Sequence, residues 1–223
     1  MSFGDAVLAL ATAVDPTREP FFVRLARGEY TPASLAVYAL RTQDLTIAFP
    51  KNLRRMIAMA ADPEAVKLLT DSLDEEVGRG PEGRVEAARS HLFLARRFVN
   101  AVGGEVEVER ATENRWTTEL LEQNRWLEAL ACFGLGFEAN VSRSYVPLVA
   151  ALSSQYGLSS EALEFFTLHI TADAEHGART AEVLARCAVT PEQQAAVSVA
   201  ARRGAAAWWQ FHRACDRAMR TFA

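Results

Sequence analysis

The chain has 223 residues, of which 50% are hydrophobic and 23% are charged, and its formal net charge is -4. A single domain of this length buries roughly 70% of its unfolded surface, so it needs no disulfide framework. The acidic balance disfavours a nucleic-acid-binding surface, and no apolar run is long enough to span a membrane. We therefore expect a cytoplasmic protein without nucleic-acid or membrane partners.

Apolar residues recur at three- and four-residue spacing, and no window alternates with period two for long enough to form a strand. Helix starts are marked by Thr31-Pro32, Asp62-Pro63, Ser159-Ser160-Glu161 and Thr190-Pro191, and stops by Gly103-Gly104 and Gly157. The predicted helices span 3–13, 19–27, 32–61 with a kink at Pro50, 63–78, 84–102, 108–122, 124–155, 159–187 and 191–221. Without a linker between halves, this predicts an all-α bundle of about seven to nine helices in one domain, residues 1–223.

Cys132, Cys187 and Cys215 are odd in number and widely separated within predicted helices. This pattern favours neither a disulfide framework nor a thiolate zinc site. We expect buried spectator cysteines.

The most specific local pattern lies in the helix predicted over 159–187. His169, Asp173 and His176 stand at i, i+4 and i+7, which places them on one face together with Phe165 and Ala172. Burying two imidazoles and a carboxylate is costly unless they are paired, and one divalent cation satisfies all three. A hydrogen-bonded core network and a partly exposed face remain alternatives to a metal site.

Glu138 lies between glycines and apolar residues in the middle of the helix predicted over 124–155. The residues that share its face at helical spacing are Ala131, Leu135, Val141 and Tyr145. The carboxylate is therefore expected to point inward. The alternative is a Glu at the edge of the core, paired with Arg143.

Asp74-Glu75-Glu76 ends the helix predicted over 63–78. Glu76 follows Leu69 and Leu73 on the apolar stripe, whereas Glu75 falls beside Asp71 on a wetter one. Glu76 is therefore the better ligand candidate of the two.

His91 begins the next helical segment. It is one of only four histidines in the chain, and three of them fall where a metal centre of carboxylates and histidines needs them. The fourth, His212, is interpreted as a packing or pocket residue.

Together, Glu76, His91, Glu138, His169, Asp173 and His176 form a set of carboxylates and imidazoles on four predicted helices. Oxygen and imidazole ligands without thiolate suit iron or manganese better than zinc. Inward-pointing carboxylates from bundle helices are how proteins hold a pair of such ions.

On these residues the sequence resembles the haem-oxygenase-like diiron oxidases and oxygenases, which are related in fold to thiaminase-II and pyrroloquinoline-quinone synthase proteins. The resemblance runs from about Tyr38 to Arg179. The motifs that carry it are Asp74-Glu75-Glu76-Val77-Gly78, Ser90-His91-Leu92-Phe93, the glycine-flanked Glu138, and His169-x3-Asp173-x2-His176. One departure is a longer insert between Glu76 and His91 than the family pattern leads us to expect.

The resemblance implies that all six residues are ligands of two Fe2+ ions per chain. It also implies catalytic roles for Glu76, Glu138, His169, Asp173 and His176. In the family, ferrous iron meets O2 to give a peroxo-bridged diferric intermediate that attacks a nearby substrate. The implied activity is a non-haem iron oxidoreductase of specialised biosynthesis, which acts on a small amine- or amino-acid-derived molecule by N-oxygenation or by oxidative C-C or C-N cleavage. The resemblance leaves open an external electron donor and a homodimer.

Two predicted helices, 32–61 and 191–221, are expected to wall the substrate pocket. The residues expected near it are Tyr38, Arg41, Asp44, Phe49, Lys51, Tyr145, Trp208, Trp209 and His212. A cavity lined by charges and aromatic rings favours a small polar substrate over a long acyl chain.

Two other functions compete with the diiron enzyme. One is a metal-free hydrolase like thiaminase-II, in which Cys132 acts near Glu138. The other is a non-catalytic helical binding module that uses the polar residues as a buried network.

Overall fold

The regular elements in the described part of the chain are helical. The computed structural model describes residues 1–80, 82–104 and 115–222. The α-helices of the first half are α1 (Phe3–Ala11), α2 (Pro20–Ala26), α3 (Pro32–Met59), α4 (Pro63–Val77) and α5 (His91–Ala101). The second half contains α6 (Arg115–Glu122), α7 (Trp126–Leu130), a π-helix (Ala131–Glu138), α8 (Ala139–Tyr156), α9 (Glu164–Cys187) and α10 (Pro191–Met219). Short 3-10 helices span Pro16–Arg18, Ala87–Arg89 and Arg220–Phe222. The described ranges contain no strand, so the predicted all-α class is confirmed.

Side-chain caps set the starts of α3, α4 and α10, as the sequence predicts. Thr31, Asp62 and Thr190 each accept a hydrogen bond from the backbone N–H three residues later, and a proline occupies the first helical position. These bonds satisfy amide groups that a helix start leaves unpaired. Gly78 and Gly157 cap the ends of α4 and α8 in the left-handed conformation, with φ values of 73° and 67°.

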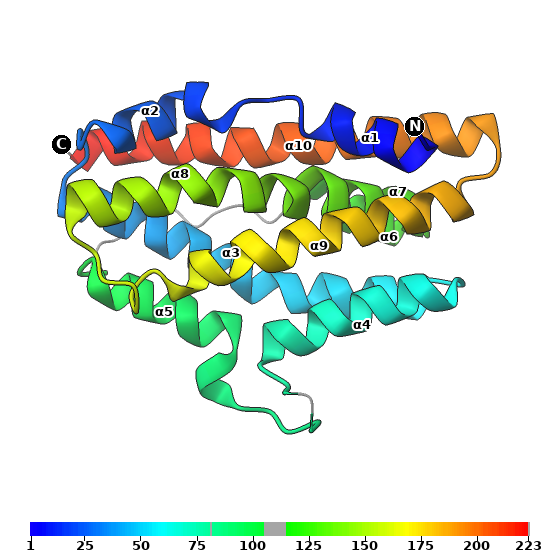
Figure 1. The fold of residues 1–223 in the computed structure, drawn as a ribbon, viewed down its shortest axis with the longest axis horizontal. Helices are drawn as coiled ribbons and strands as arrows, with labels where there is room; N and C mark the ends of the chain where they lie inside the picture. The colour runs from blue at the N-terminus through cyan, green and yellow to red at the C-terminus, as the bar shows by residue number, and fades with distance from the viewer. Residues whose placement is uncertain (81, 105–114, 223) are drawn as a thin grey trace.

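The helix predicted over 84–102 begins later than expected, because the described residues between α4 and α5 are not α-helical. Residues 82–90 form a turn and the 3-10 helix, and the Ser90 hydroxyl then caps α5 by accepting from the Phe93 N–H. A Cβ at Gly78 would lie 2.5 Å from the Glu86 carbonyl oxygen, so only glycine lets the chain turn this closely. The insert projects from the bundle (Figure 1) but returns to place His91 at the first position of α5.

Two other boundaries differ from the prediction or lie outside the described residues. α9 begins at Glu164 rather than at residue 159, because Ser159 caps a separate turn through the Ala162 N–H. Residues 105–114, which include the start of the helix predicted over 108–122, are not among the described residues. α3 runs through Pro50, as the long helix predicted over 32–61 requires.

Two clusters of buried apolar side chains make up the core. One contains Tyr38, Phe166 and Trp208, and the other contains Leu53 and Leu130. Helices α3, α9 and α10 contribute residues to both clusters. Figure 1 shows α10 lying along α1 and α2 on one side of the bundle and α4 and α5 on the opposite side, with α8 and α9 between them.

None of the helices in the described ranges combines the length and the apolarity that crossing a bilayer requires.

Candidate metal centre

All six candidate ligands are buried, and the structure sorts them into two groups. Within each group, one potential ligand atom from every residue lies within 4.8 Å of the others. The Glu76 group consists of Glu76, His91 and His169, and the Glu138 group consists of Glu138, Asp173 and His176. Sequence reasoning predicted all six residues. Their division into two groups is visible only in the structure.

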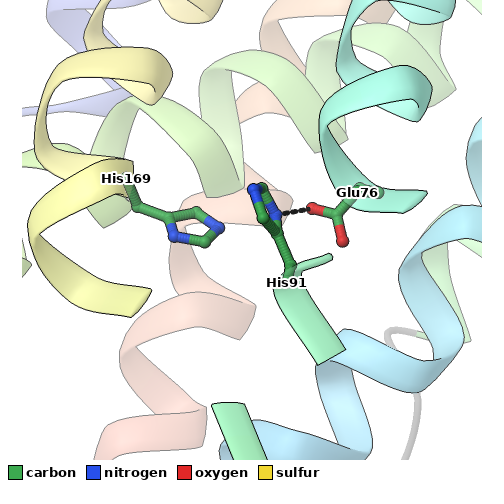
Figure 2. A group of neighbouring side chains, drawn as sticks. All are labelled: Glu76, His91 and His169. Atoms are coloured by element: carbon green, nitrogen blue, oxygen red, sulfur yellow. Dashed lines mark hydrogen bonds and ion pairs between the residues drawn. The ribbon is translucent and has the colours of Figure 1, made fainter. Parts of the chain in front are cut away.

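The Glu76 group joins side chains from α4, α5 and α9. His91 Nδ1 lies 2.7 Å from Glu76 Oε1, and the centres of the His91 and His169 rings are 4.4 Å apart. Figure 2 shows the His91 ring between the other two side chains. The insert before His91 therefore does not displace it from the set.

The orientation of His169 suits a ligand. Its Nδ1 lies 2.5 Å from the Phe165 carbonyl oxygen one turn earlier on α9, so this nitrogen donates and Nε2 keeps its lone pair. Burial and the neighbouring His91 hold the pKa of His169 well below its usual value. His169 is thus neutral at pH 7, which is the form that binds metals.

The Glu138 group joins the π-helix to α9. His176 Nδ1 lies 3.6 Å from Asp173 Oδ1 and 3.7 Å from Glu138 Oε1. Burial and the Glu138 charge raise the pKa of Asp173, although the nearby His176 imidazole opposes them. Burial lowers the pKa of His176, but the surrounding carboxylates outweigh it and raise this pKa far above its usual value. Crowded acidic groups of this kind are stabilised by a cation.

Two buried atoms show that the residues fit a metal. Glu76 Oε2 and His176 Nδ1 have no hydrogen-bond partner. Leaving such atoms buried without a hydrogen bond costs about 1–3 kcal/mol each, or more for a charged group. Each belongs to a different group, so one cation in each would satisfy both atoms. Carboxylate oxygens with imidazoles suit iron or manganese.

A small cavity of about 70 Å³ lies against both groups. Glu76, His169, Glu138 and Asp173 form part of its wall. Its aromatic walls come from Phe49, Phe133, Phe137, Tyr145, Phe165 and Trp208. Its other polar lining residues are Thr42, Thr46, Asn52 and Thr117. A reactant in this cavity would lie beside both candidate metal sites.

The prediction that Arg41, Asp44 and Lys51 lie at the pocket is wrong. Phe49, Tyr145 and Trp208 line the cavity, as expected. The expected residues that do not line it are Tyr38, Arg41, Asp44, Lys51, Trp209 and His212. Along α3 a helix turns about 100° per residue, so Thr42, next to Arg41, faces the cavity while the arginine does not.

His212 is a packing residue. It is fully buried, and the ring centres of Phe22 and Trp208 lie 4.9 Å and 4.6 Å from its own. Burial lowers its pKa to about 3. The packing interpretation made from the sequence therefore fits this histidine.

The face predicted for Glu138 is also corrected. Val141 and Tyr145 line the cavity together with Glu138, as predicted. Ala131 and Leu135 do not, and Phe133 and Phe137 line it instead. The reason is the π-helix, in which hydrogen bonds join residues five apart, so α-helical spacing does not apply. The glutamate still points inward, as predicted.

The alternative pairing of Glu138 with Arg143 is not observed. Arg143 instead donates to the carbonyl oxygens of Thr12 and Val14. Cys132 is buried beside Thr117 and does not line the cavity. This position disfavours the metal-free hydrolase in which Cys132 acts near Glu138.

Comparison with known proteins now identifies the family. The sequence model of the family described as iron-containing redox enzymes matches residues 35–209. The chain belongs to this family. The iron-containing redox enzyme family is a family of oxidoreductases, as the motifs around Glu76, His91, Glu138 and His169 led us to expect.

Two relatives of this iron-containing redox enzyme are named as biosynthetic enzymes. A protein of Chlamydia muridarum named 4-aminobenzoate synthase is 30% identical over 190 residues, covering 79% of this chain and 75% of the relative. A 4-aminobenzoate synthase of Nitrosomonas europaea is 28% identical over 203 residues, covering 87% of this chain and 82% of the relative.

Solved structures confirm the fold. A TenA homologue from Pseudomonas syringae superposes with a TM-score of 0.72 at 10% identity, covering 96% of this chain and 90% of that one. A protein with a haem-oxygenase-like fold from Shewanella denitrificans gives 0.67 at 20% identity, covering 98% and 89%. The predicted haem-oxygenase-like fold is therefore correct.

Sequence reasoning missed the contact of Glu75 and the polar residues of α3 that line the cavity. Glu75 Oε2 lies 3.5 Å from His176 Nε2, although Glu75 was assigned to the wetter face of α4. Thr42 and Thr46 stand at i, i+4 and so share one face of α3, in a stretch that also holds Arg41, Gln43 and Asp44. That spacing was the available signal for one polar stripe facing the site.

Proposed function

We propose that this iron-containing redox enzyme is a non-haem diiron oxidase or oxygenase. The observation that carries the proposal is the pair of adjacent buried three-residue groups, each containing a carboxylate and an imidazole. The Glu76 group would hold one iron and the Glu138 group the other. Iron held there would bind dioxygen and provide electrons for its reduction. An external donor that restores the ferrous state belongs to the same proposal.

The protein's own residues have distinct tasks in this proposal. Phe165 holds His169 in the tautomer that presents Nε2. Asp173 and Glu138 would balance the charge of a cation held by this group, because both carboxylates are buried. The aromatic walls exclude water, so that an oxidising reaction is confined to the bound substrate.

The cavity lining indicates the class of substrate. The described lining residues include no lysine or arginine, so the walls provide aromatic surface and the hydroxyl and amide groups of Thr42, Thr46 and Asn52. Aromatic walls favour a flat, largely apolar ring, and the polar stripe favours one or two hydrogen-bonding groups on it. We propose a small amine- or amino-acid-derived substrate that carries an aromatic ring. The name of the relatives, 4-aminobenzoate synthase, supports this class.

The test is an anaerobic ferrous titration of metal-free protein, with bound iron counted per chain, followed by stopped-flow absorbance on mixing with oxygenated buffer. We expect two irons per chain and a transient visible band. If the protein bound no iron and showed no optical change, with aromatic amines also present, the proposal would be wrong. A cytoplasmic location and a homodimer stay predictions.

A further inference from the structure

Glu75 differs from the other acidic residues on its part of α4. Asp71 pairs with Lys67 and Arg179, and Asp74 pairs with Arg79. These are ordinary ion pairs at the surface. The ion pair that the structure gives Glu75 is instead with an imidazole that is almost fully buried, that of His176.

The two nitrogens of His176 face different partners. Nδ1 is directed at Asp173 and Glu138, within the Glu138 group, and has no hydrogen-bond partner. Nε2 is on the other side of the ring, 3.5 Å from Glu75 Oε2. If Nδ1 binds a cation, the proton of the neutral ring must reside on Nε2, and Glu75 is the carboxylate next to it.

This arrangement has a known physical effect. Metal-binding histidines usually donate their other N–H to an acceptor, which fixes the tautomer and the ring orientation and makes the ligand nitrogen more basic. For His169 that acceptor is the neutral carbonyl of Phe165. For His176 it would be a carboxylate, which is the stronger acceptor because it is charged. The two groups therefore differ in this respect.

We propose that Glu75 is a positioning residue that holds His176 for the metal of the Glu138 group. This inference rests on the proposed diiron function. In this role Glu75 accepts a hydrogen bond from the Nε2–H of His176 and orients Nδ1 toward Glu138 and Asp173. The same hydrogen bond increases the electron density that His176 gives to that metal. The two metals are consequently inequivalent, and the one in the Glu138 group depends on Glu75.

Glu75 also connects this site with the surface. Its side chain is 42% exposed, and it lines an outer groove with His91 and Glu175. The groove and the inner cavity thus border the candidate metal centre through different residues. A residue in this position can be changed without opening the core, which makes the proposal testable.

The experiment compares Glu75→Leu and Glu75→Gln with Asp74→Asn. Asp74 is the adjacent residue, is similarly exposed and pairs with Arg79, so its variant removes a carboxylate that faces no ligand. Each protein is titrated anaerobically with ferrous iron, and the loaded proteins are compared by Mössbauer spectroscopy. Circular dichroism confirms that each variant is folded.

In Glu75→Leu we expect about 10- to 100-fold weaker binding of one iron and a changed spectrum for that iron alone. The Gln variant should recover part of the affinity, because its amide oxygen still accepts the Nε2 proton. Asp74→Asn should match the wild type. If both irons bind to Glu75→Leu as in the wild type, or if Gln is as impaired as Leu, Glu75 is not a positioning residue. Failure of the wild type to bind iron would instead overturn the diiron function itself.

Discussion

At the scale of single residues, His169 and His176 differ in the nitrogen that each can offer to a metal. Phe165 binds His169 through Nδ1, whereas the structure directs His176 Nδ1 at two carboxylates. Burial lowers the pKa of His91, but the adjacent Glu76 carboxylate outweighs burial and raises it. In the absence of a cation His91 therefore acts as the partner of Glu76 through Oε1, and Oε2 is the carboxylate oxygen left without a hydrogen bond.

His91 provides a direct test at this scale, since it follows the insert that departs from the family pattern. We expect His91→Gln to weaken the binding of one iron per chain by more than about tenfold, because the Glu76 group loses one of its ligands. Calorimetric titration with ferrous iron under anaerobic conditions measures this.

The matched control is His212→Gln, which makes the same replacement at a buried histidine outside both groups. It should lower stability while leaving two irons bound. Equal iron binding by His91→Gln and the wild type would show that His91 is not a ligand.

At the scale of elements, the π-helix and α10 pack backbone against backbone. A Cβ at Gly136 would lie 2.6 Å from the Gly204 Cα atom, and one at Gly204 would meet the Cys132 carbonyl. Both glycines allow the two helices to approach so closely. π-helical segments are rare and are frequently found at functional sites. Here this segment supplies Glu138 and two phenylalanines of the cavity wall.

Gly136→Ala tests this packing. Alanine is the better helix former, so helix propensity alone predicts a gain of up to about 1 kcal/mol. We expect a loss of about 1–3 kcal/mol instead, because the added methyl group overlaps the α10 backbone. Urea denaturation monitored by circular dichroism gives the free energy of unfolding.

Gly80→Ala is the control, because its Cβ would come no closer than 3.4 Å to the flexible end of Arg89. Its free energy of unfolding should change little. Unchanged or increased stability of Gly136→Ala would contradict the close contact.

At the scale of the whole molecule, the candidate ligands tie together α4, α5, the π-helix and α9. Helices α3, α9 and α10 run through both apolar clusters. We therefore propose that residues 1–223 form one domain that unfolds as a unit. The candidate ligands are spread over the chain from residue 76 to 176, so only the folded protein can bring them together.

Removal of iron should accordingly lower the melting temperature, and the protein should still unfold in a single thermal transition. Iron that binds the native state alone at 100 times its dissociation constant adds about 2.7 kcal/mol of stability. Differential scanning calorimetry of the loaded and metal-free proteins measures the shift. Two separate transitions in the metal-free protein would mean that the clusters unfold independently.

Much of the site could be predicted because its patterns are local. His169, Asp173 and His176 lie on one face of a helix whatever surrounds that helix, since spacing along one axis sets their direction. Caps such as Thr31 and Asp62 act within one turn of the chain, and they placed the helix starts correctly. The residue types alone then indicated iron or manganese.

The tertiary structure decided what depends on how helices are rotated and shifted against one another. The assignment of the ligands to two groups and the contact of Glu75 with His176 both join different helices, and periodicity describes each helix only about its own axis. The close contact of the π-helix with α10 likewise depends on packing, because Gly136 meets Gly204, which lies far away in the sequence. The sequence by itself thus determined the all-α class and the inward-facing polar residues, and it indicated iron or manganese as the metal. Packing between helices decided which of these residues meet.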